Sequence, residues 1–263
     1  MKLFRKIGVW LLISLYLIVS MGFVSKRKNN ILVEEVQIVV VDSVKNQFVN
    51  EKEIEQLLHK DELHVFGFPE SEVNTKQLET LLSKEPGIRK AEVYTGINGR
   101  ITVEIDQRDP IVRIINDRGY SYYLDGEGYI MPLSSNYTSH LLVANGAIEE
   151  EIEPTNNQKV RCAVDKEINE KAVLCNIYRL ASYIYHDSFW RSQIEQIYIV
   201  DEQNVELIPR VGAHQIILGD MKDFEIKLRN LKAFYRQGLN NIGWNKYNKI
   251  NLEYENQIIC TKR

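Results

Sequence analysis

The longest apolar stretch of the chain lies near its N-terminus, where the residues from Ile7 to Ser25 include no Asp, Glu, Lys, Arg or His. A helix of these nineteen residues would extend about 28 Å, close to the thickness of a bilayer's hydrocarbon core. A helix also satisfies its own backbone polar groups in lipid. The pattern therefore predicts a transmembrane helix over residues 7–25, with Ile7, Trp10, Tyr16 and Val24 as anchor residues.

Two other interpretations of this stretch are open. A cleaved signal peptide would use small residues such as Ser20 and Gly22, but the run is long for a signal sequence and has no Ala-x-Ala site. A core helix of a soluble protein would have to cover apolar surface on every side.

Basic residues flank the run on both sides, so charge alone does not set the orientation of the helix in the membrane. Because only residues 1–6 precede it, we expect a cytoplasmic N-terminus and a translocated C-terminal part.

After a basic linker over residues 26–33, the pattern of residues 34–107 predicts the order β-α-α-β-β. A β-branched run over 35–42 is typical of a strand. Two helices share one start signal, an Asn followed three residues later by Glu or Gln and then by apolar residues at helical spacing. Their N-caps are Asn50 and Asn74, and Asn98-Gly99 predicts a hairpin turn before an alternating strand. A three-stranded sheet with both helices on one face is the expected packing.

Residues 108–263 predict a second, mixed β-sheet domain with two helices. Short apolar and aromatic runs alternate with turn sequences such as Asp125-Gly126, as in a meander. Apolar residues recur at helical spacing over 166–186 and again over 223–239. Near the C-terminus, Ile250, Leu252 and Tyr254 alternate with polar residues, which predicts a half-buried strand.

Composition and charge exclude several functions. Residues 1–28 contain six basic side chains and no acidic ones, so the net charge of −3 leaves −9 for residues 29–263. This acidic balance argues against a nucleic-acid partner, because such binding relies on Lys and Arg. The sequence shows no catalytic motif, metal-ligand spacing or cofactor fingerprint. We expect Cys162, Cys175 and Cys260 to be small buried side chains, although a Cys162–Cys175 bridge is open.

The order of these elements resembles a known family. A β-α-α-β-β unit directly after one N-terminal anchor resembles a POTRA (polypeptide-transport-associated) domain. Residues 86–114 resemble the junction of FtsQ/DivIB cell-division proteins, in which a POTRA hairpin runs through an Arg-x-Pro element into a second β-rich domain. Arg108 and Pro110 match that element, and Asp125-Gly126 matches the family's Asp-Gly turn.

The resemblance implies an α+β chain with a single transmembrane helix, a POTRA domain over 34–107 and a partner-binding domain over 108–263. It further implies a non-enzymatic, cofactor-free protein of the inner membrane whose bulk is periplasmic. Such a protein scaffolds FtsB/DivIC-like and FtsL-like proteins, with other divisome membrane proteins, at the septum and regulates septal peptidoglycan synthesis. The expected means is β-augmentation at the C-terminal sheet edge, with Ile250, Leu252 and Tyr254 as partner-binding residues. A core position is the alternative for Tyr254.

Two further function classes are open. POTRA domains also serve proteins of outer-membrane assembly or secretion, but those chains normally carry several such units in a row. Here a single unit is followed by residues 108–263 with at least two helices. A secreted envelope enzyme, released by signal cleavage, is the third class, and an intact mature N-terminus would exclude it.

Overall fold

The computed structural model describes residues 10–20, 31–41, 48–59, 63, 65–96, 99–134, 138–150, 152, 158–160, 162, 173–255 and 257–263. The chain forms two compact units. The first ends at Gln107, and the second comprises Arg108–Arg263 together with two short earlier segments.

The predicted transmembrane segment is described only in part. Residues 10–20 form a helix, on which the side chains of Trp10 and Tyr16 are exposed. Residues 7–9 and 21–25, and with them Ile7 and Val24, lie outside the described residues. No described helix is long and apolar enough to span a bilayer, and a helix over 10–20 would extend about 16 Å.

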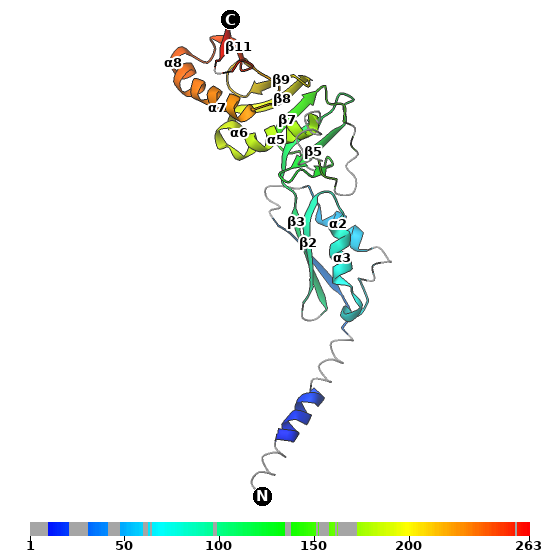
Figure 1. Ribbon diagram of the computed structural model, residues 1–263. Helices are drawn as coiled ribbons and strands as arrows, with labels where there is room; N and C mark the ends of the chain where they lie inside the picture. Colours follow the sequence, from blue (N-terminus) through cyan, green and yellow to red (C-terminus); the bar gives the residue numbers. More distant parts are fainter. Residues whose placement is uncertain are drawn as a thin grey trace. The chain divides into compact units, whose positions relative to one another are not determined.

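The first unit confirms the predicted β-α-α-β-β order. Its elements are β1 (Glu35–Val41), α2 (Glu51–Leu58), the short 3-10 turn η2 (Glu70–Glu72), α3 (Thr75–Leu82), β2 (Ile88–Thr95) and β3 (Arg100–Gln107). The sheet order is β1-β3-β2, with β1 parallel and β2 antiparallel to β3. Helices α2 and α3 lie on one face of this sheet (Figure 1) and bury Ile54, Leu58, Leu78 and Leu82 against it.

The two helix caps of the first unit act as the sequence predicted, whereas Asn98 of the predicted hairpin turn lies outside the described residues. The side chain of Asn50 accepts a hydrogen bond from the backbone N–H of Lys52 at 3.1 Å, and that of Asn74 accepts one from Gln77 at 3.1 Å. Gly99 in the β2–β3 turn has φ +71°, and a Cβ there would lie 2.3 Å from the carbonyl oxygen of Leu32. Glycine is therefore required at this turn.

The second unit is built on a nine-stranded sheet in the order β12-β11-β10-β9-β8-β7-β4-β5-β6. Neighbours β4, β7 and β8 run parallel, as do β10 and β11, and the other pairs are antiparallel. The strands are β4 (Pro110–Ile115), β5 (Ser121–Asp125), β6 (Ile130–Met131), β7 (Leu142–Gly146), β8 (Ile194–Asp201), β9 (Asn204–Pro209), β10 (Gln215–Gly219), β11 (Tyr247–Asn251) and β12 (Ile259–Lys262).

Helices cover one face of this sheet (Figure 1). The two predicted helices appear as α5 (Val173–His186) and α7 (Phe224–Phe234). Shorter segments follow them, namely α6 (Ser188–Gln193) after α5, and the π-turn η3 (Tyr235–Leu239) with α8 (Asn240–Ile242) after α7. Their apolar faces and the strands enclose one core around the fully buried Trp190.

The expectation that all three cysteines are buried is wrong, and the bridge that the sequence left open is formed. Cys162 and Cys175 form a disulfide with a Cα–Cα distance of 5.5 Å. Cys175 is buried on α5, whereas Cys162 is exposed and Cys260 on β12 is a half-buried free thiol. The bridge attaches the segment before α5 to the core side of that helix.

Candidate partner-binding edge

The C-terminal end of the chain forms an edge of the nine-stranded sheet. Strand β11 is hydrogen-bonded on both flanks, parallel to β10 and antiparallel to β12. Ile250 faces Cys260 and Asn251 faces Ile259 in this register. Among the described residues β12 pairs with β11 alone, so it is the outermost strand. An edge strand directs unpaired N–H and C=O groups outward.

The strand predicted to run through Tyr254 ends earlier. Asn251 stops it because its side-chain oxygen accepts a hydrogen bond from the backbone N–H of Glu253 at 2.8 Å, which turns the chain. Ile250 and Leu252 point into the core and are 0% and 4% exposed, respectively. Tyr254 lies in the turn that follows and is 51% exposed. Of the three predicted partner-binding residues, only Tyr254 presents its side chain to solvent.

A cavity of about 450 Å³ opens beside Tyr254. Its walls come from the start of α7 and from the loop between β11 and β12. Apolar side chains of Ile226, Leu252 and Ile258 line it together with Lys222 and Glu255. Ile226 is half exposed, which is unusual for an isoleucine on a helix that packs on a sheet. The cavity can accept an apolar side chain next to the β12 edge.

Lys227 fixes the wall of this cavity. Its ammonium group donates to the carbonyl oxygens of Leu218 at 3.1 Å and Asp220 at 2.8 Å, and it pairs with the Asp220 carboxylate at 2.6 Å. These contacts tie the first turns of α7 to the end of β10. The cavity therefore has a rigid side, as a binding surface requires.

The opposite end of β12 is held by the C-terminal residue. The guanidinium group of Arg263 donates to the carbonyl oxygen of Ala213 at 2.9 Å.

Next to Ala213, His214 is 3% exposed and is hydrogen-bonded through Nε2 to the Tyr235 hydroxyl at 2.6 Å. Burial, and then the charge of Arg263, lower the pKa of His214. Burial also raises the pKa of Tyr235, so both groups are neutral near pH 7.

The residues predicted at the domain junction come together at the start of the second unit. The guanidinium group of Arg108 donates to Asp125 at 2.8 Å, and both side chains are almost fully buried. The other carboxylate oxygen of Asp125 accepts from the N–H groups of Glu127 at 2.9 Å and Tyr129 at 2.7 Å. Pro110 pairs with Asp125 in the β4–β5 register, and Gly126 begins the turn. This cluster is structural, because its charges are neutralised internally.

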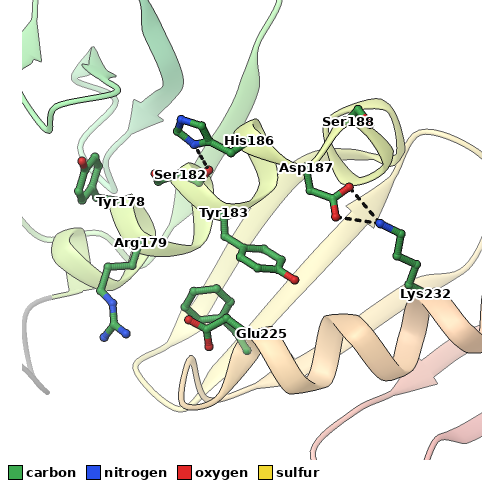
Figure 2. A pocket seen from close by; sticks show the side chains of 10 residues that line it. Tyr178, Arg179, Ser182, Tyr183, His186, Asp187, Ser188, Glu225 and Lys232 are labelled. Carbon is green, nitrogen blue, oxygen red and sulfur yellow. Dashed lines mark hydrogen bonds and ion pairs between the residues drawn. The ribbon is translucent and has the colours of Figure 1, made fainter.

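A groove of about 760 Å³ in the second unit lies between α5 and α7. Figure 2 shows two polar contacts among its lining residues, one between His186 and Ser182 and one between Asp187 and Lys232. Asp187 caps α6 by accepting from Phe189 at 2.8 Å and pairs with Lys232 at 2.8 Å. Although partial burial opposes its charge, these bonds keep the pKa of Asp187 below its ordinary value. The Nδ1 atom of His186 is hydrogen-bonded to the backbone carbonyl of Ser182 and not to the Ser182 hydroxyl. The two side chains therefore do not form a nucleophile–base pair.

Comparison with known protein families decides the identity of the chain. A model described as FtsQ/DivIB, C-terminal related, matches residues 109–261, and a POTRA-like domain model matches residues 32–106. The chain belongs to the FtsQ/DivIB family. No curated protein matches it.

FtsQ/DivIB proteins are non-enzymatic scaffolds that act through protein–protein interactions of the divisome. Membership therefore supports a role in cell division and confirms the resemblance on which the sequence-based hypothesis depends. Among the described residues no group of His, Cys, Asp and Glu is placed to hold a metal ion.

Sequence reasoning missed the residues that form the edge itself. Ile259 on β12 is exposed, yet the sequence pattern placed the last strand only around Ile250. The hairpin that folds β12 back onto β11 uses the segment from Leu252 to Ile258, which carries no Gly or Pro. The one available signal was the isoleucine pair Ile258-Ile259 close to the chain end.

Proposed function

We propose that this chain is a membrane-anchored, non-enzymatic divisome scaffold that binds a strand of an FtsB/DivIC-like partner along β12. An FtsL-like protein joins the same assembly, which regulates septal peptidoglycan synthesis. The observation that carries the proposal is the position of β12, outermost in the sheet and beside the exposed Tyr254. An added strand gains backbone hydrogen bonds from such an edge.

Geometry around β12 suits one strand with one anchoring side chain. The strand has only four residues, so backbone bonds alone give a short interface. Ile258, the residue before β12, lines the cavity beside Tyr254, so a partner side chain in that cavity would extend this interface. Large aromatic residues at such positions supply most of the binding energy in many interfaces. Tyr254 is therefore the expected hot spot, while Ile250 and Leu252 support it from the core.

The apolar run over residues 7–25 supports an inner-membrane location with a cytoplasmic N-terminus and a periplasmic bulk. The Cys162–Cys175 disulfide adds support, because disulfides persist in oxidising compartments and are rare in the cytosol. Contacts with further divisome membrane proteins would then be made on the same side of the membrane.

The proposal is tested with the full chain and its FtsB/DivIC-like partner. Replacing Tyr254 by a photo-crosslinking amino acid in cells should yield a covalent adduct with that partner. The Tyr254→Ala variant should weaken the purified complex by about tenfold or more. Tyr120→Ala is the matched control, because Tyr120 is also a half-exposed tyrosine of the second unit. Its affinity should be unchanged.

A short deletion separates the edge from the core. Removing residues 259–263 deletes β12 but leaves the buried Ile250 and Leu252 in place. We expect this variant to lose the partner while β10, which does not pair with β12, keeps its hydrogen-exchange protection. Full affinity of the deletion variant would overturn the proposal that β12 is the docking edge.

A further inference from the structure

The positive charge of the second unit is concentrated in one stretch of its chain. Residues 226–252 contain six Lys and Arg side chains and no Asp or Glu. Because residues 29–263 carry a net charge of −9, the remainder of that range carries −15. The stretch comprises most of α7, then η3, α8 and β11, which are orange to red in Figure 1. A cationic stretch in an otherwise acidic protein indicates a local interaction surface.

Most of these cations are not neutralised by the protein itself. Lys227 and Lys232 form ion pairs with aspartates. The other four are exposed and form no ion pair within the part of the chain that the structure describes, namely Arg229, Arg236, Lys246 and Lys249. An acidic ligand could therefore reach these four without first breaking an internal salt bridge.

The cations of the helix lie on one side of it. The Lys232 ammonium and the Arg236 guanidinium both lie over the ring of Phe189, at 4.9 and 5.7 Å from the ring centre. Arg229 precedes Lys232 by three residues, and residues three apart in a helix are neighbours on its surface. The ring of Phe189 holds Arg236 in place but does not cancel its charge.

A second group of cations adjoins the end of this helix. The ring of Phe234 on α7 contacts the ring of Tyr247 on β11, with their centres 6.3 Å apart. Tyr247 is opposite Lys262 in the β11–β12 register, and opposite residues of an antiparallel pair point to the same face. Lys262 therefore points to the face that α7 covers. The backbone of Lys246 accepts a hydrogen bond from the N–H of Arg263 at 3.2 Å, which places Lys246 beside the end of β12.

Neighbouring carboxylates limit what can bind to these cations. Glu225 lies one turn before Arg229, and Glu253 follows directly after the basic stretch. Charges are screened over about 8–10 Å at physiological salt. A flat anionic membrane, or a second copy of this acidic chain, would bring negative charge that close to the bordering carboxylates as well. A narrow acidic segment can contact the cations alone.

We propose that the cationic surface formed by Arg229, Arg236, Lys246 and Lys262 binds an acidic segment of another protein. The two arginines are the principal contacts, because a guanidinium group binds a carboxylate through two parallel N–H donors. The packing of Phe189, Phe234 and Tyr247 keeps the surface preorganised. Side chains form this interface, so it does not depend on strand docking along β12.

A labelled acidic peptide tests the surface on the full chain in nonionic detergent. The probe is Glu-Glu-Asp-Glu-Glu-Asp, and binding is followed by fluorescence anisotropy. We expect binding at about 50 mM salt that is largely lost at about 500 mM. The amide peptide Gln-Gln-Asn-Gln-Gln-Asn has nearly the same shape and no side-chain charge, so it should not bind.

One pair of charge reversals locates the binding site. Arg236→Glu should weaken binding of the acidic peptide by about three- to tenfold, because an attraction becomes a repulsion. Lys76→Glu is the matched control, since Lys76 is an exposed helical residue of the first unit and its reversal changes the net charge equally. Its affinity should be unchanged. Tyr254→Ala should also leave the affinity unchanged, which separates this surface from the β12 edge.

Several results would overturn the proposal. Equal binding of the amide peptide, or an unchanged affinity of Arg236→Glu, would show that the cations do not select the ligand. Weaker binding in Tyr254→Ala would assign the peptide to the β12 edge. Binding of short-chain phosphatidylglycerol without binding of the peptide would assign the surface to lipid headgroups. Self-association of the chain that Arg236→Glu abolishes would identify a second copy as the occupant.

Discussion

Asp125 shows how a single buried carboxylate organises the start of the second unit. It accepts hydrogen bonds from Arg108, Glu127 and Tyr129 while it is 2% exposed. The Arg108 guanidinium group also lies 3.8 Å from the centre of the Tyr129 ring. A buried ion pair is costly to break, because removing one partner leaves the other charge buried.

We predict that Asp125→Asn lowers the free energy of unfolding of the second unit by about 3–5 kcal/mol. The asparagine keeps the size of the side chain but removes the buried negative charge that Arg108 contacts at 2.8 Å. The loss of unfolding free energy is measured by urea titration, with hydrogen exchange over residues 110–131 as the readout. Glu127→Gln is the control, since Glu127 is exposed and its carboxylate lies 4.0 Å from Arg108. An equal loss in both variants would show that the buried pair is not the cause.

His214 gives the edge a dependence on pH. Burial and the charge of Arg263 lower the pKa of His214 below its ordinary value of 6.5. The folded chain therefore binds fewer protons than the unfolded chain between that lowered pKa and 6.5, so the unfolding free energy rises with pH there. The contribution is complete above 6.5 and is lost as the pH falls through the lowered pKa.

We predict that stability of the second unit decreases as the pH is lowered from about 7 to 5, and that His214→Gln removes part of this decrease. The measurement is the urea midpoint at several pH values. His186→Gln is the control, because His186 is exposed and its loss should leave the dependence in place. An unchanged slope in His214→Gln would assign the pH dependence to other groups.

At the scale of elements, the sequence predicts the features that depend only on residues close together in the chain, such as helix caps and the buried face of a strand. Asn50 and Asn74 cap helices through bonds that reach only two or three residues along the chain. Alternation in Ile101, Val103 and Ile105 likewise reports one buried face of one strand. Helix caps and strand alternation can be predicted from the sequence because the residues that determine them lie within the same short segment.

Contacts between segments that are far apart in the sequence cannot be predicted in the same way. The sequence assigns Arg108 to the Arg-x-Pro element and Asp125 to the Asp-Gly turn. It does not predict the direct bond between them, because that bond depends on the β4–β5 register. The end of β11 at Asn251 depends on a side-chain bond that competes with the strand pattern. β12 exists as a strand because β11 is there to pair with it. Edges, and hence the candidate sites, are properties of the assembled sheet.

For the whole molecule, membership in the FtsQ/DivIB family agrees with a role in protein–protein interactions of the divisome. Each unit has its own core, and β12 is an outermost strand of the sheet in the second unit. A scaffold of this kind works only on the side of the membrane where its partners are. The compartment of the bulk is therefore the property on which the proposed β12 interface depends.

The disulfide makes that compartment measurable. We predict that Cys162 and Cys175 are bridged in cells when the full chain is expressed, because translocation exposes them to an oxidising environment. A chain that lacks residues 1–25 should stay in the cytosol with both thiols reduced. Maleimide labelling under denaturing conditions, with and without prior reduction, counts the free thiols by mass. Cys260, which is a free thiol, serves as the internal standard for labelling in both samples. Reduced cysteines in the full-length chain would place its bulk in the cytosol and contradict the proposed β12 interface. A bridge in both forms would mean that the disulfide does not report location.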